Sequence, residues 1–330
     1  MDKFPRILIT GGTGAVGPVV VKAFHAAGYA VRMFSIDPPP AGIWPDEVEA
    51  LVGDITDETA VRAAMKDVNS VIHMAALLHI VNPHPGMREK YERINVTGTK
   101  NVIDAATAAG VTRIVLFSTI AVYGSSDGRI LHELSAVHPE TLYAQTKYAA
   151  EQLVLSTRRA DHQPLGTVLR FGAIYGSRIK GNYESLIQAL AHHRFIPIGN
   201  GLNRRTLIYD KDVGRAAVQA VSHPAAAGRL FNVTDGGYHA MNAIIKAICS
   251  GLGRSTPRWS LPVEPTRTLV HLIEKGVDAI GLKPPVTREM IDKYIEDIAV
   301  DGSLFQKEIG FVPQYDLKTG WEETIREMRK

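Results

Sequence analysis

Cysteine is nearly absent from the chain, since Cys249 is the only one among 330 residues. No disulfide can therefore form within the chain, and we expect a reducing compartment. The sequence also lacks a run of about 18 uncharged apolar residues, which a membrane-spanning helix requires. Its first residues do not show the charged, apolar and small-residue succession of a signal peptide. These absences predict a cytoplasmic protein.

The chain also lacks a large excess of charge of either sign. The formal net charge is only +3, so the sequence predicts no nucleic-acid partner. The twelve histidines do not stand at ligand spacing with nearby cysteines or carboxylates, and no metal site is expected. The remaining composition, 45% hydrophobic and 22% charged, is that of a globular protein with room for one large domain and an appended lobe.

Short apolar runs alternate with helical patterns through the first half of the chain. Runs that are apolar on both faces, separated by amphipathic helices, indicate a parallel sheet covered on both sides. The predicted fold class is therefore α/β, a Rossmann-type doubly wound parallel sheet. We expect strands at 6–10, 30–34, 51–54, 70–76, 113–119 and 166–176, and helices at about 16–27, 59–66, 96–109 and around Tyr143.

The pattern becomes irregular and rich in glycine and proline after about residue 175. We assign residues 1–174 and about 207–235 to the dinucleotide-binding domain. The smaller C-terminal substrate-binding lobe comprises about 175–206 and 236–330, with helices at about 183–192 and 241–252.

A glycine-rich turn joins the first strand to the first helix. Gly11 permits a tight turn, Gly14 lets a pyrophosphate approach the backbone, and Gly17 lets helix and strand pack closely. Ala15 and Val16 stand where the helix N-terminus offers free N–H groups and a positive dipole to phosphates. In this position, between the first strand and the first helix, the turn predicts a dinucleotide site.

The end of the second strand bears on the choice of cofactor. An acid is expected there for NAD, but the chain has Ser35, followed two residues later by Asp37. Asp37 can serve either as the ribose ligand or as an ordinary turn residue before prolines. Because no arginine follows to accept a 2′-phosphate, NAD is favoured slightly and NADP stays open. Asp54, which ends the next strand, and Ile55 suit the adenine edge and its packing face, although an aspartate at the end of a strand is also a common helix cap.

Tyr143 and Lys147 stand four residues apart, so they share one helix face with Cβ atoms roughly 5–6 Å apart. The spacing alone is common on exposed helices. Combined with the glycine-rich turn and the STIAVYG segment from Ser118 to Gly124, it outlines a nicotinamide-dependent active site.

With His73 to Ala76, Asn95 and Thr119, these residues resemble the extended short-chain dehydrogenase/reductase superfamily and its NAD-dependent epimerase/dehydratase family. The resemblance extends into the second half through RRTLIYDKDV (204–213) and FNVTDG (231–236). It is greatest to nucleotide-sugar epimerases and 4-keto reductases, with bacterial 3β-hydroxysteroid dehydrogenase-like enzymes as the near alternative.

The resemblance implies roles for individual residues. Tyr143 would be the general acid/base, Lys147 would bind the nicotinamide ribose and lower the tyrosine pKa, and Thr119 would hydrogen-bond the reacting oxygen. Asn182 and Arg205 would hold the diphosphate of a nucleotide-sugar substrate. Further cofactor contacts would come from Ala75, Ala76, Asn95 and Ser118. A homodimer is also implied.

Two positions depart from the family pattern. Ala173 stands where many nucleotide-sugar enzymes have asparagine, which removes one polar contact. Ile120 and Ala121 follow Thr119 where dehydratases place an acidic pair, so a 4,6-dehydratase is not expected.

Three functions remain in view from the sequence. The first is an epimerase or 4-keto reductase acting at C4 of a UDP- or dTDP-sugar, and the second a 3β-hydroxysteroid dehydrogenase-like alcohol oxidoreductase. Whether Arg205 faces the pocket discriminates between them. The third is a dinucleotide-binding regulator without turnover, against which the retention of Thr119, Tyr143 and Lys147 argues.

Residues 268–283 carry an apolar stripe at helical spacing, formed by Leu269, Leu272, Ile273, Val277 and Ile280. Such a stripe could rest on a membrane surface. We expect it instead to pack against the appended lobe, as in an ordinary half-buried helix.

Overall fold

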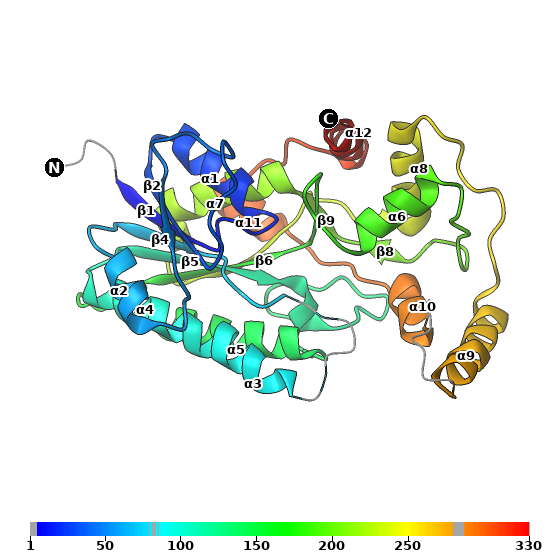
Figure 1. The fold of residues 1–330 in the computed structure, drawn as a ribbon, viewed down its shortest axis with the longest axis horizontal. Helices are drawn as coiled ribbons and strands as arrows, with labels where there is room; N and C mark the ends of the chain where they lie inside the picture. The colour runs from blue at the N-terminus through cyan, green and yellow to red at the C-terminus, as the bar shows by residue number, and fades with distance from the viewer. Residues whose placement is uncertain (1–4, 79, 81–83, 85, 280–286, 330) are drawn as a thin grey trace.

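A seven-stranded parallel sheet forms the centre of the molecule (Figure 1). The computed structural model describes residues 5–78, 80, 84, 86–279 and 287–329, without the side chains of 276–279. The strand order is β10-β6-β5-β4-β1-β2-β3, which confirms the predicted doubly wound fold. The strands are β1 (Arg6–Thr10), β2 (Ala30–Ser35), β3 (Glu49–Val52), β4 (Ser70–His73), β5 (Arg113–Thr119), β6 (Gly166–Phe171) and β10 (Leu230–Val233).

Helices cover both faces of this sheet. Alternation along β1 shows why: Ile7 and Ile9 join one hydrophobic core, while Leu8 points the other way into a second core. The first face carries α1 (Gly17–Ala26), α7 (Asp210–Ser222) and α11 (Ser303–Ile309), and the second carries α2 (Glu58–Ala64), α4 (Gly98–Ala108) and α5 (Leu142–Ser156) (Figure 1). On the second face, α3 (Met87–Tyr91) runs through a π-helical segment (Glu92–Thr97) into α4.

The C-terminal lobe has a core of its own, in which Trp321 stacks on Tyr175 with ring centroids 4.3 Å apart. Its helices are α6 (Asn182–Ala191), α8 (Met241–Leu252), α9 (Val263–Ala279), α10 (Arg288–Ile295) and α12 (Leu317–Met328). Two short sheets complete it: β7 (Ala173–Tyr175) with β9 (Leu207–Tyr209), and β8 (Arg204–Arg205) with β11 (His239–Ala240). None of the helices in the described residues is both long enough and apolar enough to cross a membrane.

The structure differs from the sequence-based prediction in several places. The strands expected at 51–54 and 70–76 span Glu49–Val52 and Ser70–His73 instead. The strand expected at 166–176 is divided at Gly172, where a Cβ atom would lie 3.0 Å from the Thr206 carbonyl oxygen. Helix α11, in the range assigned to the lobe, packs on β10 and places Phe305 in the core of the main sheet. The sequence of a short helix such as α11 has no periodic pattern that shows whether the helix packs on the main sheet or in the lobe.

A further difference concerns the apolar stripe of 268–283, which was expected to pack against the lobe. That expectation is wrong for Leu269, Leu272 and Ile273, which are exposed on α9. The Val277 side chain and Ile280 lie outside the described parts of the structure.

Candidate active site

The predicted cofactor residues lie at the carboxyl ends of β1, β4 and β5, where the strand order reverses and where open α/β sheets bind ligands. Gly11 has a φ of +75°, and a Cβ atom there would stand 2.8 Å from the Ala75 amide nitrogen. At Gly17 a Cβ atom would meet the Gly12 carbonyl oxygen at 2.0 Å. Larger residues would therefore push the turn away from β4 and open it.

Free amide groups line the inside of this turn. Val16 precedes α1 without a side-chain cap, and Pro18 occupies its first turn. Within the described residues, the N–H groups of Ala15 and Val16 donate to no protein acceptor. Together with the glycine-rich turn, these donors at a helix N-terminus fit the pyrophosphate of a dinucleotide.

Ser35 and Asp37 occupy different environments. The Ser35 hydroxyl is buried and accepts a hydrogen bond from the Thr13 amide at 3.2 Å, which ties β2 to the glycine-rich turn. Asp37 is exposed in the loop beyond β2. Ser35 is thus part of the turn, while Asp37 is free to rotate toward a ribose.

The residues predicted to contact adenine, Asp54 and Ile55, are held by hydrogen bonds and close packing. Asp54 accepts a hydrogen bond from the Thr56 amide at 2.9 Å and so forms the turn that leads to α2. The carbonyl of buried Ile55 is held by the Asn101 amide at 3.0 Å. The Ile55 side chain also packs against Gly98, where a Cβ atom would lie 2.7 Å from its Cδ1.

A buried chain of hydrogen bonds fixes His73 at the end of β4. The Thr99 hydroxyl donates to the Asn95 carbonyl at 2.6 Å, so its oxygen must accept from His73 Nε2 at 2.9 Å. His73 Nδ1 then accepts from the Thr10 hydroxyl at 2.8 Å. Burial, with the charge of Lys147, lowers the pKa of His73 to about 3, so the imidazole is neutral. Sequence reasoning assigned His73 no role of its own.

Asn95 and Tyr91 hold the loop that follows β4. Asn95 lies in the π-helical segment, where its Oδ1 accepts from the Leu77 amide at 2.7 Å and its Nδ2 donates to Thr146 Oγ1 at 3.0 Å. The Tyr91 hydroxyl donates to the Leu78 carbonyl at 2.7 Å. π-Helical turns often mark functional sites, and here the extra residue turns Asn95 toward α5.

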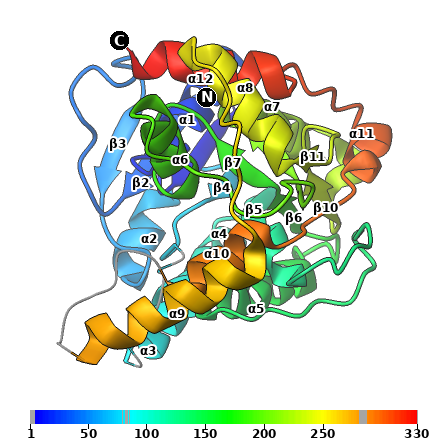
Figure 2. The ribbon, with the colours of Figure 1, turned by 90° about the vertical axis from the view of Figure 1, so that its right-hand side faces the viewer.

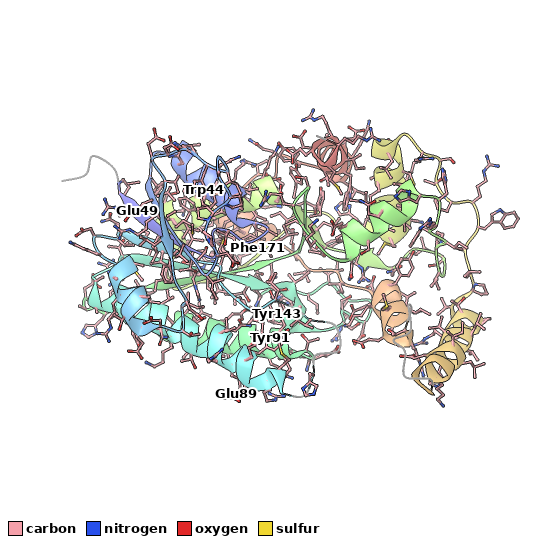
Figure 3. All side chains as sticks on the ribbon, in the orientation of Figure 1. Trp44, Glu49, Glu89, Tyr91, Tyr143 and Phe171 are labelled. Carbon is pink, nitrogen blue, oxygen red and sulfur yellow. The ribbon has the colours of Figure 1, made fainter. Side chains whose placement is uncertain are left out.

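Thr119, Tyr143 and Lys147 occupy the same edge of the sheet. The Thr119 side chain, at the end of β5, accepts from the Ala121 amide at 3.1 Å, which leaves its hydroxyl proton free to donate. Tyr143 and Lys147 stand on one face of α5, and Tyr91 contributes to the pKa of Tyr143; both tyrosines are labelled in Figure 3. The structure therefore places Thr119 at the end of β5, and Tyr143 with Lys147 on the helix α5 that packs against that strand.

The ionisation of Tyr143 and Lys147 is controlled by burial. Lys147 is only 3% exposed, and desolvation lowers its pKa to about 8, partly opposed by the nearby Glu151 carboxylate. Burial, with a smaller contribution from Tyr91, raises the pKa of Tyr143 to about 12. The resemblance implied the opposite direction for the phenol. The protein groups alone therefore keep Tyr143 protonated, because burial disfavours the charged phenolate.

A buried ion pair lies one helical turn beyond Lys147. Glu151, with its side chain fully buried, accepts from Arg170 Nε at 2.9 Å and Nη2 at 2.6 Å. The Ser118 hydroxyl also donates to Glu151, at 2.5 Å, so this predicted cofactor residue is directed into the protein. The Arg170 guanidinium covers the Tyr123 ring at 4.7 Å. Glu151 was missed by sequence reasoning, although its position, four residues after Lys147, puts it on the same helix face.

Arg205 is bound to the C-terminus of α10. Its guanidinium donates to the carbonyl oxygens of Lys293 and of Tyr294, the latter at 3.1 Å, and lies 3.8 Å from the Glu296 carboxylate. The charge also lowers the pKa of Tyr183, in the first turn of α6, although burial raises that pKa overall. Asn182 begins α6 and is exposed. The charge of Arg205 thus acts on Tyr183 in α6, while its donors are directed to α10.

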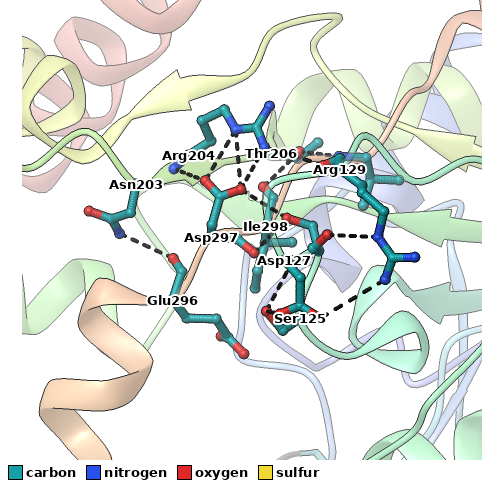
Figure 4. Close-up of polar contacts among 11 residues, drawn as sticks. Ser125, Asp127, Arg129, Asn203, Arg204, Thr206, Glu296, Asp297 and Ile298 are labelled. Atoms are coloured by element: carbon teal, nitrogen blue, oxygen red, sulfur yellow. Dashed lines mark hydrogen bonds and ion pairs between the residues drawn. The ribbon is translucent and has the colours of Figure 1, made fainter.

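Arg204 anchors the segment that follows α10 (Figure 4). It binds the Asp297 carboxylate through Nε at 3.1 Å and Nη2 at 2.6 Å, and its backbone amide binds the same group at 2.6 Å. These bonds, with that from Ser126, lower the pKa of Asp297 to about 2. Neighbouring residues on a strand point to opposite sides, so β8 holds α10 with one arginine and the following segment with the other.

Known proteins match the chain over nearly its whole length. The UDP-glucose 4-epimerase of Vibrio cholerae is 25% identical over 329 residues, which cover 98% of this chain and 96% of that protein. The decarboxylating sterol-4-alpha-carboxylate 3-dehydrogenase of Homo sapiens is 29% identical over 265 residues, 78% of this chain and 69% of that protein. The solved structure of MoeE5 with UDP-glucuronic acid and NAD has a TM-score of 0.75 at 24% identity, covering 98% and 99% of the two chains, and so shares the fold.

Residues 7–234 match the family described as "NAD dependent epimerase/dehydratase family". This range includes the glycine-rich turn, Thr119, Tyr143, Lys147 and Arg205. The chain therefore belongs to the NAD-dependent epimerase/dehydratase family of enzymes.

Proposed function

We propose that the protein transfers a hydride between a nicotinamide dinucleotide and C4 of a nucleoside-diphosphate sugar, as an epimerase or a 4-keto reductase. The proposal is supported by the positions of Thr119 at the end of β5, of Tyr143 and Lys147 on the adjacent helix α5, and of the glycine-rich turn after β1. NAD is the proposed cofactor, because the family depends on NAD and no arginine follows β2 to receive a 2′-phosphate.

In this proposal Tyr143 moves the proton. It accepts the proton of the C4 hydroxyl as the sugar is oxidised and returns it on reduction. The bound dinucleotide supplies the hydride acceptor or donor, and its oxidised ring adds positive charge. Lys147, charged below about pH 8, favours the phenolate, and the free Thr119 proton can bond to the reacting oxygen.

One structural feature supports a nucleotide sugar as the substrate. The length of the matches does not separate the two classes, since the V. cholerae UDP-glucose 4-epimerase matches 98% of the chain and the 3-beta-hydroxysteroid dehydrogenase of Mycolicibacterium neoaurum matches 97%. The charge of Arg205, however, acts on Tyr183 in the first turn of α6, and a guanidinium and a helix N-terminus can bind a diphosphate together.

A second candidate, an alcohol dehydrogenase of a sterol-like substrate, is favoured by one observation. The Arg205 charge is already satisfied by two carbonyl groups of α10 and by Glu296, so a diphosphate must displace them. An apolar substrate would leave these bonds in place.

Thermal unfolding with UDP or dTDP tests the choice. We expect both nucleotides to raise the Tm of the wild type, and Arg205→Gln to lose most of this protection while it still binds NAD. Arg194→Gln, at an exposed position of the same lobe, controls for the loss of one positive charge. If neither nucleotide protects the protein, and a 3β-hydroxysterol reduces NAD at a rate that depends on Tyr143, the sugar proposal is wrong.

A further inference from the structure

His73 lies at the centre of a buried hydrogen-bond network that the proposed chemistry does not use. Its side chain is buried, and its two ring nitrogens bond to Thr10, at the end of β1, and to Thr99 on α4. Figure 2, like Figure 1, shows α4 lying below β4, the strand that His73 ends. The histidine therefore connects the strand before the glycine-rich turn with a helix on the second face of the sheet. We call Thr10, His73, Thr99 and Asn95 the His73 network.

The groups at the two ends of the His73 network determine the direction of every hydrogen bond between them. At one end the Thr99 hydroxyl donates to the Asn95 carbonyl, because a carbonyl can only accept. At the other end the Thr10 oxygen accepts from the two backbone amides that follow His73, both at 3.2 Å, because an amide N–H can only donate. His73 must therefore donate from Nε2 to Thr99 and accept at Nδ1 from the Thr10 hydroxyl.

A proton on Nδ1 would break this arrangement. Nδ1 would then be a donor, and the Thr10 oxygen would have to turn a lone pair toward it and away from a backbone amide. Burial, with the charge of Lys147 on α5, lowers the pKa of His73 to about 3. The environment of His73 therefore keeps the imidazole neutral, as the network requires.

The His73 network holds both ends of the segment 74–77, which follows β4. Thr10 binds the first two amides of the segment, and Asn95 binds both the amide and the carbonyl of Leu77, at 2.7 and 3.1 Å. Asn95 Nδ2 also donates to Thr146 on α5. The segment is thus held between β1 and α5.

We propose that His73 is a positioning residue for the dinucleotide, which fixes the place of the segment 74–77 through the Thr10 hydroxyl. This inference rests on the cofactor site of the proposed function, in which Ala75 and Ala76 contact the dinucleotide. Without an acceptor at Nδ1, the buried Thr10 hydroxyl must turn to another partner, and its lone pairs then leave the two amides. Because His73 is enclosed by Thr10 and Thr99, it acts on cofactor affinity rather than on kcat.

Calorimetry of NAD binding to the full chain tests the proposal. His73→Phe, which fills the space without ring nitrogens, should weaken NAD binding about tenfold, as one lost hydrogen bond can, while kcat at saturating NAD stays within about threefold of the wild type. His73→Gln should restore most of the affinity, because its amide keeps one acceptor and one donor. Thr324→Val is the control, since it removes a buried hydrogen bond of α12 and should lower the Tm without changing NAD affinity.

NMR of isotope-labelled histidine tests the tautomer in the wild type, and so does not depend on whether His73→Phe folds. We expect the His73 signal, assigned by its absence in His73→Gln, to show a neutral ring with the proton on Nε2 between about pH 5 and 8. Titration in that range, or a proton on Nδ1, would overturn the proposal.

The binding data distinguish this proposal from the function on which it rests. Wild-type protein that binds no NAD would overturn both. NAD binding that His73→Phe leaves unchanged, or that His73→Gln does not restore, would overturn only the role of His73.

Discussion

Lys147→Met should make the protein more stable at pH 7 while it removes activity. The ammonium is 3% exposed, and burial lowers its pKa from 10.5 to about 8. A difference of about 2.5 pKa units corresponds to about 3 kcal/mol by which the folded state disfavours the charged form. Methionine keeps most of the apolar stem and has no charge to desolvate. For a chain of 330 residues, about 3 kcal/mol raises the Tm by about 4 °C.

The sign and the pH range of this effect follow from the direction of the shift. A lysine whose folded-state pKa is lowered costs stability fully below that value, and the cost declines as pH rises toward the unfolded pKa. The advantage of Lys147→Met should therefore be greatest below about pH 8 and nearly vanish above about pH 10.5.

Urea unfolding at pH 7 and pH 10, with turnover measured beside it, tests this reasoning. Lys22→Met, at an exposed position of α1, gives the effect of the residue change alone. If Lys147→Met were less stable than the wild type at pH 7, or equally stabilised at both pH values, then Lys147 would not carry a desolvated charge.

Three further predictions address neighbouring residues. Tyr143→Phe should lose about 10²–10⁴ in turnover, with unchanged NAD affinity by calorimetry, because only the proton carrier is deleted; near-normal turnover would remove Tyr143 from the mechanism. Glu151→Gln should lower the free energy of unfolding by about 3–5 kcal/mol, since it leaves buried Arg170 unpaired, and should shift the alkaline limb of the pH–rate profile to lower pH. An unmoved limb would mean that Glu151 does not support the Lys147 charge. Asp37→Ala should shift cofactor preference from NAD toward NADP, and an unchanged ratio of affinities would make Asp37 a turn residue only.

The sheet and the cofactor turn could be predicted because their signals are local. The central strands are rich in apolar residues, and the three glycines stand directly between a strand and a helix. Tyr143 and Lys147 could be paired for the same reason, since four residues on one helix fix their relative position.

The polar networks could not be predicted, because their partners are distant in sequence. His73 bonds to Thr10, 63 residues away, and to Thr99, 26 residues away. Glu151 meets Arg170 only because α5 packs on β6. The raised pKa of Tyr143 likewise depends on burial by surrounding elements, which residue spacing does not encode.

For Arg205, the role that the resemblance implied differs from the contacts that the structure shows. The resemblance implied that its donors bind a diphosphate, whereas in the structure they are directed to α10, 88 residues further along the chain. A cation at a helix C-terminus is stabilised by the carbonyl dipoles, so these bonds stabilise α10. A diphosphate that binds the guanidinium must interact with it more strongly than α10 does. A ligand shifts an equilibrium only by its difference in affinity for the two states, here Arg205 bound to α10 and Arg205 released from it. In the proposed function, the strength of the Arg205–α10 contact therefore limits how tightly a nucleotide sugar can bind.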